Sequence, residues 1–173
     1  MDASLKQLHD QIDDATAGLL ETLSRLTDDD VRRPSLLPGW TRGHVATHLA
    51  RGGEALRNLL EDRPPYVSQV ARDAGIEAGS ARGAAELAGD VRASAAAFRE
   101  TALAQPDDGW DRVLTVPGVG SFPAGQVLIR RLVELELHHV DLDAGYRPAD
   151  WPTTFNELEL VEPMRTQRAD RIV

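Results

Sequence analysis

Apolar residues recur at every third or fourth position over most of this chain. The first such stripe comprises Leu5, Leu8, Ile12, Ala15, Leu19, Leu23 and Leu26. This spacing places them on one face of an α-helix. Similar stripes, with cap and stop signals at their ends, predict helices from Thr41 to just before Pro64, from about Ser80 to Ala104, and from about Pro123 to Gly145. Four long amphipathic helices predict an all-α helical bundle.

The connections between these helices differ in character. Residues 66–79 carry no clear periodicity and are expected to be irregular, whereas WDRVLTVPGVGSF, within 107–123, predicts a small hairpin or an ordered loop. Both links are long, which allows a crossover topology. After Trp151-Pro152 the pattern predicts a short helix containing Phe155, Leu158 and Val161, then a frayed polar tail from Arg165.

A length of 173 residues suits one compact unit. We expect residues 1–152 to form this helical bundle. Residues 153–173 are expected to add a C-terminal helix and tail, which is not a separate domain.

Charge and cysteine content restrict the classes of function. The chain has 19 basic and 28 acidic residues, a net charge of −9 that is spread along the sequence, which argues against nucleic acid as a partner. No apolar run approaches the roughly 20 residues needed to cross a bilayer, and MDASLKQLHD is unlike a signal peptide. We therefore expect a cytoplasmic monomer or homodimer that binds no membrane. Because the chain has no cysteine, any thiol chemistry needs an external thiol.

Histidines form the strongest chemical signal. Four of the five occur as two pairs on two different predicted helices, His44 with His48 and His138 with His139. Glu134 lies four residues before His138, about 40° away around the helix axis, on a polar stripe that borders the apolar one. A partly buried carboxylate and imidazole need a partner, and a divalent metal is one solution.

His48 is the best third ligand, since it lies on the inward face of its helix. The alternative is that Glu134 and His138 form an ordinary surface pair. His44 is expected to satisfy backbone groups at its helix start or to pack against Trp40. His139 is expected at the boundary of the core.

The sequence allows more than one role for charged residues near Glu134 and His138 on the same predicted helix. Arg131 is expected either to orient Glu134 or an anionic ligand, or to be a partly exposed surface arginine. Asp141 is either an acceptor behind a metal ligand or an ordinary charge near the helix end. Glu136 points about 200° away from Glu134 and is expected to be solvated.

Two segments carry a family resemblance. LPGWTRGHVATH, which ends at His48, and RLVELELHHVDL, which starts at Arg131, closely resemble the two signature stretches of the mycothiol-dependent maleylpyruvate isomerase N-terminal domain, within the DinB-like superfamily. A weaker similarity extends from the first helix to about Pro152. The resemblance implies a DinB-like four-helix bundle in which His48, Glu134 and His138 hold a divalent metal, most commonly Zn²⁺.

The same resemblance implies an enzyme. Its expected activity is that of a thiol transferase or cis–trans isomerase, in which mycothiol is the cosubstrate and its metal-bound thiolate attacks a small electrophile. Arg131 and Asp141 are then candidate catalytic residues that support the three ligands. A metal-dependent hydrolase and a non-enzymatic metal-binding sensor or interaction bundle are the alternatives. Family isomerases continue into a C-terminal domain that supplies a substrate-binding arginine, whereas this chain ends at Val173. The resemblance therefore does not identify the electrophilic substrate.

Overall fold

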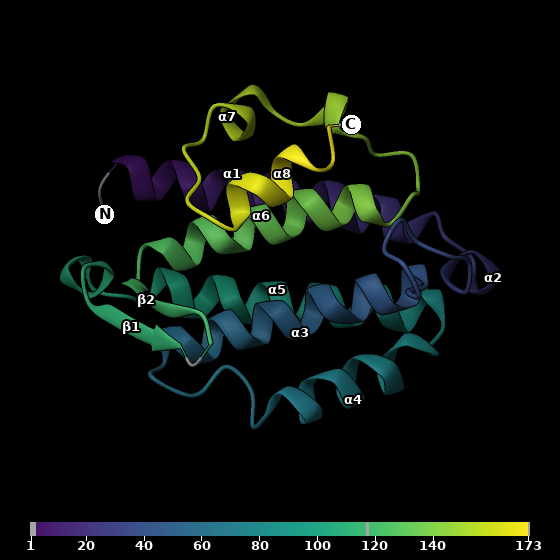
Figure 1. Cartoon of the computed structure of the whole chain (residues 1–173), viewed down its shortest axis with the longest axis horizontal. Helices are drawn as coiled ribbons and strands as arrows, with labels where there is room; N and C mark the ends of the chain where they lie inside the picture. The colour runs from purple at the N-terminus through teal and green to yellow at the C-terminus, as the bar shows by residue number, and fades with distance from the viewer. Residues whose placement is uncertain (1–2, 117, 173) are drawn as a thin grey trace.

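Four long helices form the body of the molecule. The computed structural model describes residues 3–116 and 118–172. Helix α1 (Ala3–Ser24) packs against α5 (Ala84–Leu103) and α6 (Gln126–Asp141), and α3 (Arg42–Leu60) packs against the same two helices. The four helices thus enclose one core (Figure 1). The prediction of an all-α bundle is confirmed, with the predicted stripes facing inward.

The core is built from the apolar faces of these helices. Its fully enclosed side chains include Leu19, Leu49, Leu87, Val91, Phe98, Leu128, Leu132 and Leu135. Arg131 is the largest of the fully buried side chains, and it lies among these apolar groups. Gly53 on α3 makes room for it, because a Cβ atom there would lie 3.3 Å from the Arg131 guanidinium carbon.

A hairpin occupies one end of the bundle, as one of the two predicted alternatives for residues 107–123. It follows a 3₁₀ turn, η1 (Asp107–Trp110), and consists of β1 (Val113–Val116) and β2 (Gly120–Pro123). The strands are antiparallel, with Val113 opposite Pro123 and Val116 opposite Gly120. Leu114, Val116 and Phe122 direct their side chains to the core and close this end of it.

The expectation of an irregular segment over 66–79 is wrong, because a further helix, α4 (Gln69–Ser80), lies there on the outer side of α3 (Figure 1). Ser68 caps it by accepting a hydrogen bond from the Ala71 amide. The helix approaches α3 closely, since a Cβ atom at Gly79 would lie 2.5 Å from Thr47 Cγ2. The next helix consequently begins at Ala84 rather than near Ser80.

The C-terminal segment also differs from its prediction. After η2 (Pro148–Asp150), α7 (Thr153–Asn156) is only one turn long, and Val161 is exposed instead of lying on a helix. The predicted frayed tail contains α8 (Met164–Ala169), which packs on α6 (Figure 1). The remaining short helix, α2 (Asp28–Val31), precedes α3. No helix in the described ranges combines the length and apolarity that a bilayer crossing requires.

Candidate metal centre

The start of α3 sets the position of the first histidine pair. Thr41 caps the helix: its hydroxyl accepts from the His44 amide, while the His44 imidazole accepts from the Thr41 amide at 3.1 Å. The His44 ring also stacks on Trp40. Both expected roles of His44 are therefore confirmed. His48, one turn later, lies on the inward face and is 8% exposed.

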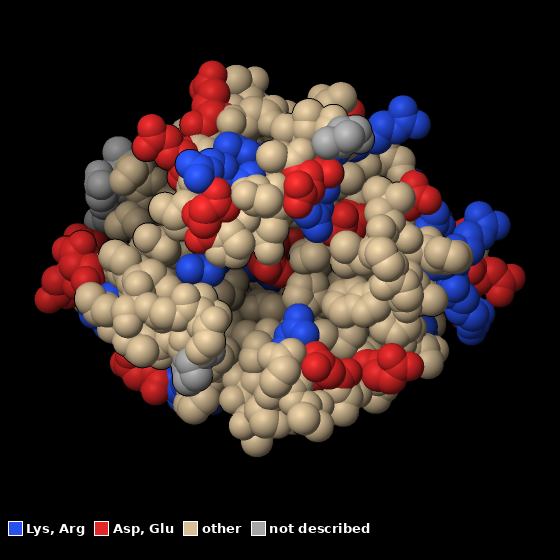
Figure 2. Space-filling model, in the orientation of Figure 1, with Lys and Arg blue, Asp and Glu red and all other residues tan. Residues whose placement is uncertain are grey.

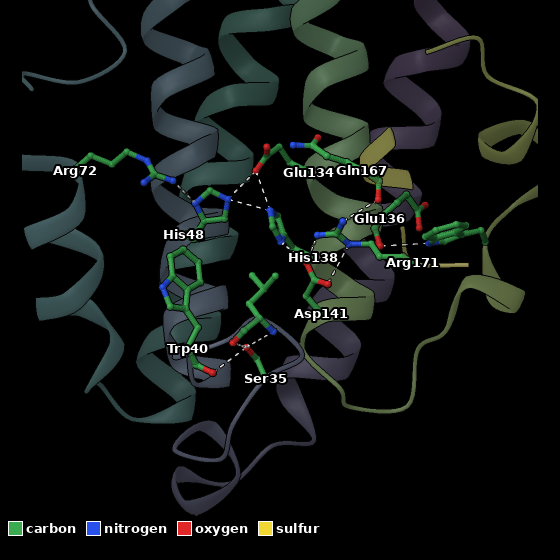
Figure 3. Close-up of polar contacts among 12 residues, drawn as sticks. Ser35, Trp40, His48, Arg72, Glu134, Glu136, His138, Asp141, Gln167 and Arg171 are labelled. Carbon is green, nitrogen blue, oxygen red and sulfur yellow. Dashed lines mark hydrogen bonds and ion pairs between the residues drawn. The ribbon is translucent and has the colours of Figure 1, made fainter. Parts of the chain in front are cut away.

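The three predicted ligands meet between α3 and α6 (Figure 3). His48 Nε2 lies 2.9 Å from Glu134 Oε2 and 3.0 Å from His138 Nε2. His138 Nε2 lies 3.4 Å from the same Glu134 oxygen. All three potential ligand atoms lie within 4.8 Å of one another. Among the described residues, these three form the cluster that could hold a metal ion. The structure thus brings together residues that are far apart in the chain.

The protonation of this group follows from burial and mutual contact. Burial acts to raise the pKa of Glu134, but hydrogen bonds from His138 and His48 overcome it and hold that pKa well below its usual value. Burial lowers the pKa of His48. Burial also acts to lower the pKa of His138, yet its bonds to Asp141 and Glu134 raise it to about 9. Without a metal, the group is a carboxylate between one neutral and one protonated imidazole.

Asp141 fixes the ring of His138. Its Oδ2 accepts from His138 Nδ1 at 2.8 Å, which turns Nε2 toward the other two ligand atoms. Asp141 thus accepts a hydrogen bond from a candidate ligand, and it is also the last residue of α6. The same carboxylate accepts two hydrogen bonds from Arg171, which follows α8 (Figure 3).

His48 has a different outer contact. Arg72 of α4 donates from Nη2 to His48 Nδ1 at 3.0 Å. An arginine cannot accept a hydrogen bond, so this contact requires His48 to carry its own proton on Nε2. Coordination through Nε2 requires the opposite tautomer, with the proton on Nδ1. The contact with Arg72 therefore has to break when His48 acts as a ligand.

The donor set fits a divalent metal in other respects. Two imidazole nitrogens and one carboxylate oxygen are the ligands of many catalytic zinc sites, which leave a fourth position open. Ligand atoms around tetrahedral zinc lie about 3.3 Å apart, as bond lengths of roughly 2.0–2.2 Å require. The separations of 2.9, 3.0 and 3.4 Å in this group are close to that value.

Arg131 is neither at the surface nor bonded to Glu134. It is fully buried, and its Nη1 donates to the Leu49 carbonyl of α3 at 2.9 Å. The guanidinium lies near the face of Phe98, and burial lowers its pKa to about 10. Its contact joins α6 to α3 at the residue next to His48. Arg131 is thus placed to set the distance between the two ligand-bearing helices.

Two further sequence predictions have opposite outcomes. His139 lies at the core boundary as expected, 2.8 Å from Thr22 Oγ1 and stacked on Tyr146 at 3.8 Å. The expectation that Glu136 is solvated is wrong: it is 3% exposed and accepts from the Tyr146 hydroxyl at 2.6 Å. The loop after α6 covers this side of the helix, so pointing away from Glu134 does not mean pointing into water.

A cavity of about 310 Å³ opens over the ligand group, with His48 and Glu134 in its lining. Figure 2 shows a hollow near the middle of this face, with basic side chains at its edge and acidic atoms inside. The wall comes from several elements and includes Tyr66, Arg72, Phe122, Arg130, Met164 and Gln167.

Arg130 stands out in this wall. Its guanidinium carbon lies 4.1 Å from the Phe122 ring centroid, and its buried Nε has no hydrogen-bond partner in the described part of the chain. Burial lowers its pKa. Arg130 thus places a positively charged group in the wall of the cavity.

Arg72, Arg130 and Arg171 are the site residues that sequence reasoning missed. Arg130 lies next to Arg131 on the predicted helix, but the helical stripe drew attention to Arg131 instead. Arg72 and Arg171 lie in segments that were expected to be irregular or frayed. Only a correct prediction of helices α4 and α8 could have indicated that Arg72 and Arg171 lie near the site.

Comparison with known proteins identifies a family and similar solved structures. A family profile described as the mycothiol maleylpyruvate isomerase N-terminal domain matches residues 12–143. Two solved structures, of the mycothiol-dependent maleylpyruvate isomerase and of a histidine-to-alanine mutant of it, are each 28% identical with a TM-score of 0.82. Each match covers 87% of this chain and 65% of the solved chain, so this chain spans less than two thirds of their length. No curated protein matches the chain.

Proposed function

Because the chain belongs to the mycothiol maleylpyruvate isomerase N-terminal domain family, we propose that it is a metal-dependent enzyme that uses mycothiol to transform a small electrophile, as a thiol transferase or an isomerase. The observation that carries this proposal is the convergence of His48, Glu134 and His138 at an open cavity. The lack of any cysteine agrees with it, since the thiol then has to come from a cosubstrate.

The proposed ligands are His48 Nε2, Glu134 Oε2 and His138 Nε2, and Zn²⁺ is the proposed metal. When bound, such a metal lowers the pKa of a thiol in its open position, so that a thiolate is available near neutral pH. Asp141 keeps His138 in the ligating orientation. Arg131 keeps α6 and α3 at the required distance. These are supporting roles rather than direct contacts with substrate.

The cavity wall supplies contacts for the electrophile. Arg130 lines the cavity, and the Arg72 guanidinium, which also lines it, is freed once it leaves His48. Both guanidinium groups suit a polar or anionic end of a substrate. Val116, Phe122 and Met164 offer an apolar surface for its carbon skeleton. We propose that the electrophile lies between these two kinds of surface.

The proposal is tested by thiol-dependent turnover. Zinc-loaded and metal-depleted protein are incubated with a panel of electrophiles that includes maleylpyruvate, each with mycothiol, with another low-molecular-weight thiol, and with none. Turnover that needs both metal and mycothiol supports the proposal. Product without any thiol would indicate a metal-dependent hydrolase instead. Stoichiometric metal without turnover of any electrophile would favour a sensor or interaction bundle.

A further inference from the structure

The geometry points to Arg171 as a positioning residue of the metal centre, so that the C-terminal segment 163–172 is part of the site. This inference rests on the proposed function, because it concerns how His138 is held for a metal. It starts from the contact between Arg171 and Asp141. Arg171 Nη2 lies 2.7 Å from Asp141 Oδ2, and Nε lies 3.0 Å from Oδ1. Such a two-point contact fixes the plane of the carboxylate as well as its charge.

Asp141 needs this support. It is 3% exposed, and it is the last residue of α6, where the negative end of the helix dipole disfavours a carboxylate. Without Arg171, this buried carboxylate would keep only its bond with the His138 imidazole.

The shared oxygen makes the link to His138 direct. Asp141 Oδ2 accepts from both Arg171 and His138 Nδ1, at 2.7 and 2.8 Å. Arg171 therefore holds the oxygen that keeps the His138 proton on Nδ1 and leaves Nε2 free to coordinate. Partners that bond directly to a metal ligand, as Asp141 does to His138, typically contribute 10–100-fold to metal affinity, and Arg171 acts through this partner.

The segment that carries Arg171 is docked by other contacts as well. Met164 is 4% exposed against the core, and Arg168 donates to the carbonyls of Phe155 and Leu158 at 2.7 and 3.0 Å. Gln167 lines the cavity. The segment can thus stay docked when the Arg171 side chain alone is removed. Arg168 is a matched control, because it anchors the same C-terminal segment through the Phe155 and Leu158 carbonyls and does not contact the ligand group.

The test measures Zn²⁺ affinity by competition with a chelator for the full chain and for Arg171→Gln, Arg171→Lys, Arg168→Gln, Asp141→Asn and the Asp141→Asn/Arg171→Gln double variant. We expect Arg171→Gln to lower the affinity about tenfold and Arg171→Lys to restore part of it. Arg168→Gln should lower the unfolding temperature but leave the affinity unchanged. In the Asp141→Asn background, Arg171→Gln should cause little further loss, because its effect passes through that carboxylate.

A metal-bound spectrum gives a second measurement. With Co²⁺, the visible absorption of Arg171→Gln should change relative to the unsubstituted chain, and that of Arg168→Gln should not. Unchanged affinity and spectrum in Arg171→Gln, or an equal loss with and without Asp141, would overturn this inference while leaving the proposed function intact. If the unsubstituted chain binds no divalent metal, the proposed function fails and this inference fails with it.

Discussion

The Nε2 atoms of His48 and His138 face each other at 3.0 Å although 90 residues separate the two histidines in the chain. Their rings meet almost at right angles, with an interplanar angle of 86°. Both Nε2 atoms also approach the same carboxylate oxygen, Glu134 Oε2, at 2.9 and 3.4 Å. This carboxylate can therefore stabilise either the protonated imidazole of the metal-free group or a cation bound in its place.

Removing a ligand should remove the metal without unfolding the bundle. We expect His48→Ala, Glu134→Ala and His138→Ala to lose stoichiometric Zn²⁺, because two remaining ligands bind weakly. Elemental analysis after dialysis measures the metal, and circular dichroism measures helix content. His139→Ala is the matched control for His138→Ala, since its ring contacts Thr22 and Tyr146 instead. Full metal retention in both His48→Ala and Glu134→Ala would rule out this ligand set.

Metal affinity should rise with pH. The pKa of His138 is raised to about 9 in the metal-free protein, so a metal that binds at pH 7 has to displace one proton. We expect the apparent affinity to increase about tenfold per pH unit from 7 to 8.5 and to level off above 9. Asp141→Asn removes a contact that raises this pKa, and it should flatten the dependence. An affinity that is constant over this range in the unsubstituted chain would contradict the assignment.

Removing Arg72 should strengthen metal binding. Its donor contact with His48 Nδ1 favours the tautomer that cannot coordinate through Nε2, and its positive charge opposes that of the metal. We expect Arg72→Leu to raise Zn²⁺ affinity about three- to tenfold by this loss of competition. Arg82→Leu is the control, because Arg82 pairs with Asp90 away from the ligands. A lower affinity in Arg72→Leu would show that Arg72 supports the metal rather than competing with it.

His139 should make the fold sensitive to acid. Burial lowers its pKa to about 4, so the folded protein holds this imidazole neutral between pH 4 and 6.5 while the unfolded chain protonates it. The unfolded state then binds more protons, and the free energy of unfolding falls as the pH is lowered through this range, by ~3 kcal/mol from this group.

Urea unfolding of metal-free protein at pH 7 and pH 4.5 measures this loss. His139→Gln keeps an amide that can bond to Thr22 but cannot take up the proton, so its stability should fall less over the same range. Equal losses in the two proteins would assign the acid sensitivity to other groups.

Periodicity was sufficient for the parts of the structure that bury a wide apolar face. It located the four long helices, and it placed Glu134 and His138 on one stripe because residues four apart on a helix always share a face. Helix α4 escaped notice because Ile76 is its one buried apolar side chain, so it shows almost no stripe. Helix α8 buries only Met164. In both, docking to a neighbouring helix supplies the stabilisation that the local pattern does not indicate.

The charged contacts around the ligands lay further beyond sequence reasoning. Arg171 meets Asp141 across 30 residues, and Arg72 meets His48 across 24, so neither pair has a characteristic spacing. The error over Glu136 has a similar cause. A helical wheel gives its direction correctly, but whether that direction meets water depends on where Tyr146 and Trp151 return to the helix.

The cavity wall draws on more parts of the fold than the proposed ligands do. His48, Glu134 and His138 lie on two long helices locked together by the core, whereas much of the wall belongs to the hairpin, the segment before α4 and the C-terminal helix. Changes in these peripheral pieces can alter which molecule is accepted while the reactive centre keeps its form. Related proteins with this architecture can therefore keep the same metal chemistry and differ in their substrates.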